Sequence, residues 1–190
     1  MHLKQKVNSL RKRGWDYSQN AGYFITISTP LKTRFFGDIP ENKMHLSEEG
    51  KLAEKFWLEI PNQFPYAEIA EFVIMPDHMH GILIVNKTSE SAIKYLEALN
   101  LQPHDEDFLN ELNKKNGGVT GEKNPMLHQD LSRIIRWYKG RCTFEIRKIN
   151  AAFQWTSKFH DQIIWNNRVH QNVVNYILNN PKNWKHRKIK

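Results

Sequence analysis

The sequence predicts an α+β fold in which helices pack on one mostly antiparallel sheet. Runs rich in β-branched and aromatic residues alternate with amphipathic runs in the order strand, helix, strand, strand, helix, strand, helix. Only Pro76 and Asp77 separate the two adjacent strand runs, a spacing that favours an antiparallel hairpin. The chain has 190 residues, of which 39% are hydrophobic and 25% are charged, which is typical of one globular domain with a substantial core.

The first two expected elements are a strand and a helix. Residues 22–29 read GYFITIST, a β-rich run that ends before Pro30. A helix is expected to begin after Ser47, which can act as N-cap, and to be stopped by Pro61. Its apolar positions recur every four residues, at Leu52, Phe56 and Ile60.

The central elements are the two strands of the hairpin, residues 68–76 and 78–86. The segment that follows, residues 88–127, has no sustained pattern. We expect a short helix over residues 89–100 and, further on, a mobile glycine-containing loop. The glycines of this loop are Gly117, Gly118 and Gly121.

The C-terminal part of the chain is expected to contribute two helices and the last strand. Residues 130–149 carry one continuous apolar stripe with the basic residues largely off it, as in an amphipathic helix. The stripe consists of Leu131, Ile134, Ile135, Tyr138, Cys142, Ile146 and Ile149. A strand over 158–166 and a helix over 168–180 follow, and Pro181 ends the helix.

Charge is abundant and unevenly distributed. The 28 basic and 20 acidic side chains give a net charge of +8, and the segments 1–14, 131–148 and 181–190 are strongly basic. Such a pattern suits a polyanionic partner such as nucleic acid, whereas basic tails that only keep the protein soluble are the alternative. The basic residues that we expect to contact DNA are Arg11, Arg13, Arg133, Arg136, Lys139, Arg141, Lys182 and Lys185.

The chain is expected to consist of a basic arm (1–20), one domain (21–184) and a basic tail (185–190). Mean hydropathy is −0.67, and no apolar run approaches the roughly 18–20 residues of a membrane span. The N-terminus lacks the apolar stretch of a secretory signal. The single cysteine, Cys142, cannot form an internal disulfide, which fits a reducing cytosol. We therefore expect a cytoplasmic protein without a membrane partner.

His78 and His80 are two residues apart at the start of an expected strand. Side chains with this spacing point to the same face, about 6–7 Å apart, and two imidazoles can converge on one metal ion. The spacing alone favours a hydrogen-bonded structural pair over a metal site. Asp77 is expected to point to the opposite face of the strand, so we do not expect it to join the histidines.

Two tyrosines lie in the last two expected helices. Tyr176 and Asn180 lie one turn apart in the last helix and therefore share a face, although Tyr176 also fits the apolar stripe of that helix. Tyr138 lies on the apolar stripe of the preceding helix beside Lys139, which favours a place in the core or on the face that contacts DNA. Composition and spacing do not decide the role of Tyr176.

Four blocks of the sequence together resemble one protein family. They are the opening RGWDYSQNAGYFITIST with FFGDI, the run VIMPDHMHGILIV, the run FHDQIIWN, and NYILNNPKNW near the C-terminus. In order and spacing they are similar to the REP-associated tyrosine transposases, a branch of the single-tyrosine HUH transposases. The resemblance extends from about residue 13 to residue 184.

The resemblance implies a ferredoxin-like HUH transposase fold over 21–184. It implies that His78 and His80 bind Mg²⁺ or Mn²⁺, and that Tyr176 attacks DNA to form a 5′-phosphotyrosine. Asn180 falls on a position where relatives carry a glutamine ligand, and asparagine is one methylene shorter.

The resemblance further implies single-stranded or hairpin DNA as the substrate and a nucleoid-associated place in the cytoplasm. It also raises a homodimer as one option, because relatives include dimers. The family carries arginine-rich residues after a tryptophan near the penultimate block, whereas Trp155 is followed here by Thr156, Ser157 and Lys158. The alternative function is a DNA-binding module that has lost catalysis.

Overall fold

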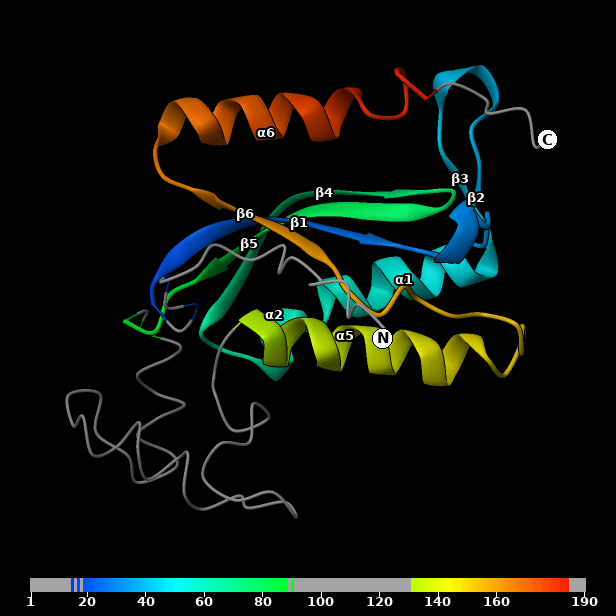
Figure 1. The fold of residues 1–190 in the computed structure, drawn as a ribbon, viewed down its shortest axis with the longest axis horizontal. Helices are drawn as coiled ribbons and strands as arrows, with labels where there is room; N and C mark the ends of the chain where they lie inside the picture. Colours follow the sequence, from blue (N-terminus) through cyan, green and yellow to red (C-terminus); the bar gives the residue numbers. More distant parts are fainter. Residues whose placement is uncertain (1–14, 16, 18, 89, 91–130, 185–190) are drawn as a thin grey trace, which may run out of the picture.

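The computed structural model describes residues 15, 17, 19–88, 90 and 131–184. Its centre is a four-stranded sheet in the order β4-β5-β1-β6, in which every neighbouring pair is antiparallel (Figure 1). The strands are β1 (Ala21–Ser28), β4 (Ala67–Met75), β5 (His78–Val85) and β6 (His160–Ile164). The expected α+β fold is confirmed.

Helices cover both faces of this sheet. The helix α6 (Asn167–Asn179) lies on one face, and α1 (Glu48–Leu58) and α5 (Leu131–Ile146) lie side by side on the other (Figure 1). The alternation of β5 assigns its side chains to these two layers. His78, His80 and Ile82 face α6, whereas Met79 and Leu83 join the core beneath α1 and α5.

The layer formed by α1 and α5 contains the main core, which is rich in aromatic side chains. The Trp57 ring packs edge-on against Tyr138, with ring centroids 5.2 Å apart. Gly81 lets Trp57 approach the sheet, because a Cβ atom at this position would lie 2.5 Å from Cζ2 of Trp57. Ser47 caps α1 as expected, since its hydroxyl accepts a hydrogen bond of 3.1 Å from the Gly50 N–H.

The layer formed by α6 has a much smaller core. Among the described residues, its buried hydrophobic side chains are Ile82, Val173 and Ile177, with a ring of partly buried apolar neighbours. Each such side chain contributes about 1.5–3 kcal/mol on burial, which is enough to hold one amphipathic helix on the sheet. Asn166 caps the first turn by accepting a hydrogen bond of 3.0 Å from the Val169 N–H.

Most of the expected elements are present. The hairpin is confirmed, because Met75 pairs with His78 across the two-residue turn Pro76–Asp77. The predicted helix 130–149 is observed as α5, and Ile149 lies beyond its end with 57% of its surface exposed. The helix α1 ends at Leu58, three residues before the proline, and Pro61 instead lies in the first turn of the short helix α2 (Ile60–Gln63). A proline fits a first turn because it needs no N–H partner there.

The segment between β1 and α1 was not predicted. It contains the short helical turns η1 (Pro30–Lys32) and η2 (Pro40–Asn42) and a second sheet formed by β2 (Gly37–Asp38) and β3 (His45–Leu46). Leu31 and Lys32 both have positive φ angles, 52° and 57°, which side chains rarely adopt. Two-residue strands carry too little periodicity to be recognised in a sequence.

Several sequence expectations lie outside the described residues. They concern the basic arm over 1–14, the short helix and glycine loop over 91–130, and the basic tail 185–190. Among the helices that the structure describes, none is long and apolar enough to cross a membrane.

Candidate active site

The two histidines of β5 lie together beneath α6. Their rings meet edge to face with centroids 4.6 Å apart, and both side chains are almost fully buried. The alternation of the strand causes this arrangement, because His78 and His80 are two residues apart. The expected shared face is therefore observed.

Each histidine uses its Nδ1 atom for a hydrogen bond within the protein. Nδ1 of His78 donates to Oδ1 of Asp77, because a carboxylate can only accept. Nδ1 of His80 lies 2.8 Å from Oγ1 of Thr26, the residue opposite it on β1. Such partners orient an imidazole and leave Nε2 available for a ligand.

The contact with Asp77 corrects the expectation that this carboxylate points away from the histidines. The expectation applied strand alternation to Asp77, but this residue lies in the turn that precedes β5, where alternation does not hold. Thr26 was not singled out from the sequence at all. Its role follows from the register between β1 and β5, which a sequence does not reveal.

His80 is uncharged at neutral pH. Burial, followed by repulsion from His78 and Lys32, lowers the pKa of His80 from 6.5 to about 3. A neutral imidazole keeps a lone pair on one nitrogen. When the proton is on Nδ1 and donated to Thr26, the lone pair is on Nε2, which faces α6.

Tyr176 reaches this nitrogen from α6. Its hydroxyl oxygen lies 3.3 Å from Nε2 of His80, and its ring packs edge-on against Phe24 with centroids 5.8 Å apart. Val173 and Ile177 are buried in the same helix and anchor it to the sheet, whereas 50% of the Tyr176 surface is exposed. Tyr176 is therefore at the border between the site and solvent, and a single chain supplies both the histidines and the tyrosine.

A hollow of about 370 Å³ opens beside Tyr176 at the C-terminal end of α6. Trp184 forms one wall: its ring lies 6.0 Å from that of His78, and the Arg34 guanidinium lies 5.8 Å above the Trp184 ring. The hollow is lined by Lys32, Asp77, His78, Tyr176, Asn180, Asn183 and Trp184. The structure thus brings Tyr176, His78 and Asn180 together around one open space.

The side chains of this site fit a divalent cation. Two imidazoles with occupied Nδ1 atoms, together with the Asn180 amide, provide neutral nitrogen and oxygen donors of the kind that such ions accept. Within residues 15, 17, 19–88, 90 and 131–184, no group of three or more His, Cys, Asp or Glu side chains is arranged to hold a metal. A closed structural zinc site is therefore not formed by the described part of the chain.

Tyr138 lies in the core, as its position in the sequence favoured. It is fully buried, and its hydroxyl donates a hydrogen bond of 3.2 Å to the Ala53 carbonyl. Burial raises the pKa of Tyr138 well above 10, which makes its phenolate inaccessible. Cys142 is buried beside it, also as expected.

The basic residues expected to contact DNA do not gather in one place. Lys182 is exposed just beyond α6, whereas Arg133, Arg136, Lys139 and Arg141 belong to α5, on the opposite face of the sheet (Figure 1). Arg11, Arg13 and Lys185 lie outside the described residues.

Two of the cations of α5 have partners within the protein. The Lys139 ammonium donates hydrogen bonds of 2.8 and 3.1 Å to the carbonyls of Thr156 and Ser157, and burial lowers its pKa. The Arg141 guanidinium lies 5.2 Å from the centre of the Phe56 ring and 3.9 Å from a Glu145 carboxylate oxygen.

No family model matches the chain. A Haemophilus influenzae protein described as uncharacterized is 30% identical over 177 residues, which cover 93% of this chain and 88% of that protein. The structure of a REP-associated tyrosine transposase bound to a REP hairpin matches with a TM-score of 0.55 and 16% identity, over 90% of this chain and 73% of that one. A match at this identity establishes the fold. The chain therefore belongs to the same protein family as the Haemophilus influenzae protein and has the fold of the REP-associated tyrosine transposase.

Proposed function

We propose that the protein is a transposase-type enzyme that cleaves and rejoins single-stranded DNA through a covalent bond to Tyr176. The observation that carries this proposal is the distance of 3.3 Å between the Tyr176 hydroxyl and Nε2 of His80. A half-exposed phenol on a helix here faces a buried, oriented pair of imidazoles on a separate strand. Such a combination is typical of a nucleophile beside an electrophilic site. The packing of the hydrophobic core does not require it.

The reaction is a transesterification at a DNA phosphate. Oη of Tyr176 attacks the phosphorus atom, the bond from phosphorus to the 3′ oxygen breaks, and the phenol proton passes to solvent. The leaving 3′ oxygen takes up a proton, so that the products are a 5′-phosphotyrosine and a free 3′-hydroxyl. Attack of a 3′-hydroxyl on the phosphotyrosine reverses these steps and rejoins a strand.

A divalent cation, Mg²⁺ or Mn²⁺, held by His78, His80 and Asn180 would supply Lewis-acid stabilisation of the charge on the phosphate oxygens. The lone pair on Nε2 of His80 can serve only one partner at a time. In the structure this partner is the Tyr176 hydroxyl, 3.3 Å away. Forming a free phenolate at pH 7 costs about 4 kcal/mol, and Lys32 lines the same hollow as Tyr176.

Hairpin-containing single strands are the proposed substrate. The structural neighbour is bound to a REP hairpin, and the net charge of +8 favours a polyanionic partner for this chain. Because one chain supplies both the tyrosine and the histidines, the site does not need a second copy. The alternative function, a DNA-binding module without catalysis, makes a different prediction for the experiment below.

The test is covalent capture of the DNA. The wild-type protein, incubated with a single-stranded hairpin oligonucleotide and Mn²⁺, should form a protein–DNA adduct that survives a denaturing gel. Tyr176→Phe removes one oxygen from a half-exposed side chain, so it should bind the hairpin with near wild-type affinity and form no adduct. His78→Ala and His80→Ala should also abolish the adduct.

Tyr138→Phe is the matched control, because it makes the same chemical change at a buried tyrosine. It should still form the adduct. An adduct that survives in Tyr176→Phe and disappears in Tyr138→Phe would show that the nucleophile is misassigned. If the wild type binds the hairpin but never forms an adduct, the protein is a binding module.

A further inference from the structure

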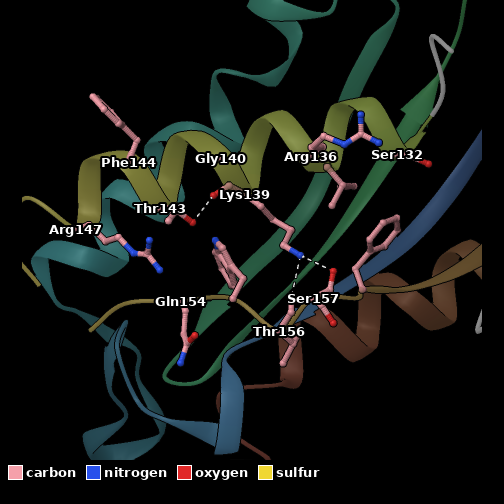
Figure 2. Close-up of a pocket in the computed structure, with 13 residues that line it drawn as sticks. Ser132, Arg136, Lys139, Gly140, Thr143, Phe144, Arg147, Gln154, Thr156 and Ser157 are labelled. Atoms are coloured by element: carbon pink, nitrogen blue, oxygen red, sulfur yellow. Dashed lines mark hydrogen bonds between the residues drawn. The ribbon is translucent and has the colours of Figure 1, made fainter. Parts of the chain in front are cut away.

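A hollow on the described surface lies away from Tyr176, along α5. It has a volume of about 850 Å³ and is bounded by α5 and by the loop over residues 153–159 that leads to β6 (Figure 2). That volume lies within the usual range of ligand sites, about 300–1,000 Å³. The proposed chemistry at Tyr176 gives this hollow no role.

The hollow combines positive charge with aromatic surface. Arg136 and Arg147 lie at its two ends, with Lys139 between them (Figure 2). None of the described residues that line it is acidic. Arg147 uses Nε for a hydrogen bond of 2.9 Å to the Phe153 carbonyl, which orients its guanidinium. Trp155 lines the hollow, and the indole N–H of this buried side chain has no hydrogen-bond partner among the described residues.

Gly140 gives an independent indication that something approaches α5 here. A Cβ atom at Gly37, Gly50 or Gly81 would lie 2.0–2.5 Å from another atom, so the protein itself requires glycine there. At Gly140, in the middle of α5 and in the lining of the hollow, no described atom outside the adjoining backbone of α5 and the two neighbouring residues lies within 4 Å of that position. Glycine disfavours a helix interior, and a ligand that touches the helix backbone explains its presence.

A second hollow of about 420 Å³, here called the connecting hollow, borders both the α5 hollow and the hollow beside Tyr176. It shares Thr156 and Ser157 with the α5 hollow, and it shares Lys32 with the hollow beside Tyr176. Lys158 adds a further cation to its lining. Leu31 stands at this second hollow with 99% of its surface exposed, in a backbone conformation that leucine rarely adopts. An exposed apolar side chain beside cations is suited to contact an unstacked base.

From these observations we infer that the α5 hollow is a second DNA subsite, which holds an unpaired nucleotide of the strand that reaches Tyr176. The strand passes along the connecting hollow by Lys32 and Lys158, and the two arginines bind its phosphates. The inferred ligand is a single strand because base surface and phosphate must both be accessible to fit this lining. The inference rests on the proposed function, since it places both subsites on one substrate.

The test is to fill the α5 hollow from Gly140. Gly140→Trp introduces a large side chain where the described protein leaves space, and tryptophan disfavours a helix less than glycine does. Binding of a fluorescent 20-nucleotide oligothymidylate, measured by anisotropy, should weaken about tenfold, as for the loss of one stacked base. Gly140→Ala should weaken it less, and Lys158→Ala should weaken it without altering the hollow itself.

Leu58→Trp is the matched control, because it places the same side chain on an exposed position of α1. It should leave the affinity for oligothymidylate unchanged. Affinity for a blunt duplex, whose bases are stacked, should be equal in Gly140→Trp and wild type. An equal loss for duplex and single strand would overturn the base-binding part of the inference. A lower melting temperature of Gly140→Trp in the absence of DNA would overturn it as well, because the chain itself would then occupy the hollow.

The path between the two subsites can be tested by cross-linking. An oligothymidylate containing 4-thiothymidine is irradiated with Tyr176→Phe, and the attached peptides are identified by mass spectrometry. Cross-links to the segment 153–159 that disappear in Gly140→Trp support the inference. If wild type forms the Tyr176 adduct while Gly140→Trp binds oligothymidylate normally, the second subsite is wrong and the proposed function stands. If no adduct forms but Gly140→Trp weakens binding, only the proposed function fails.

Discussion

The chemistry of the two histidines depends on what their second ring nitrogens contact. Asp77 and Thr26 each engage an Nδ1 atom, so both Nε2 atoms remain for a metal or a tyrosine. The sequence indicated the histidine pair, because a spacing of two on a strand determines a shared face. The sequence could not indicate Thr26, because its contact with His80 depends on the pairing of two strands that lie far apart in the chain. The two residues are separated by 54 positions.

Thr26→Val tests this orientation of His80. Valine keeps the branched shape of threonine but removes the hydroxyl, so the ring of His80 loses the partner of its Nδ1. We expect the affinity for Mn²⁺, measured by calorimetry, to fall by about tenfold or more, since loss of such partners costs roughly 10–100-fold in metal binding. Far-ultraviolet circular dichroism should be unchanged. Thr88→Val, an exposed control, should bind Mn²⁺ as the wild type does.

Whether a helix or strand could be predicted from the sequence depended on its length and on the periodicity of its apolar residues. The 16-residue helix α5 and the hairpin β4–β5 carry enough apolar residues for their period to be recognised. The segment between β1 and α1 has two-residue strands and turns, and its structure depends on contacts such as the hydrogen bond of 3.1 Å from the Phe36 N–H to the Pro76 carbonyl. Such contacts join distant parts of the chain and leave no local pattern.

Two glycines provide a prediction at the level of these elements. In β5, a methyl group at Gly81 would lie 2.5 Å from the Trp57 ring, whereas at Gly140 in α5 it would meet nothing in the described chain. Gly81→Ala should destabilise the protein by about 1–3 kcal/mol through overpacking. Gly140→Ala should stabilise it by about 0.4–1 kcal/mol through helix propensity and a less flexible unfolded chain.

Thermal unfolding monitored by circular dichroism measures both changes. For a chain of this size, 1 kcal/mol shifts the melting temperature by about 2–4 °C, so the two variants should move in opposite directions. A melting temperature of Gly81→Ala equal to that of the wild type would mean that the Trp57 ring can move aside. That result would contradict the tight packing of the layer formed by α1 and α5.

At the level of the whole molecule, the sheet separates the candidate site at Tyr176 from the cations of α5. Tyr176 and the histidines lie on the α6 face, and the cations of α5 lie on the other face (Figure 1). The connecting hollow, with Lys32 and Lys158 in its lining, shares Thr156 and Ser157 with the α5 hollow. The sequence revealed the charge of each segment but not this arrangement, because it depends on how the loop over 153–159 folds against the end of β1.

The salt dependence of binding tests whether one strand uses the whole route. Lys32, Lys158, Arg136 and Arg147 line its hollows, and Lys182 is exposed just beyond α6. Neutralising about five phosphates of a single strand gives a slope of log K against log[salt] of about −3.5. The double variant Arg136→Ala/Arg147→Ala removes two of these contacts and should reduce the slope to about −2.1. Lys51→Ala/Lys55→Ala removes the same charge from the exposed surface of α1 and should keep the wild-type slope. Equal slopes for both double variants would mean that α5 attracts DNA only through net charge, and the strand would then not follow the connecting hollow to α5.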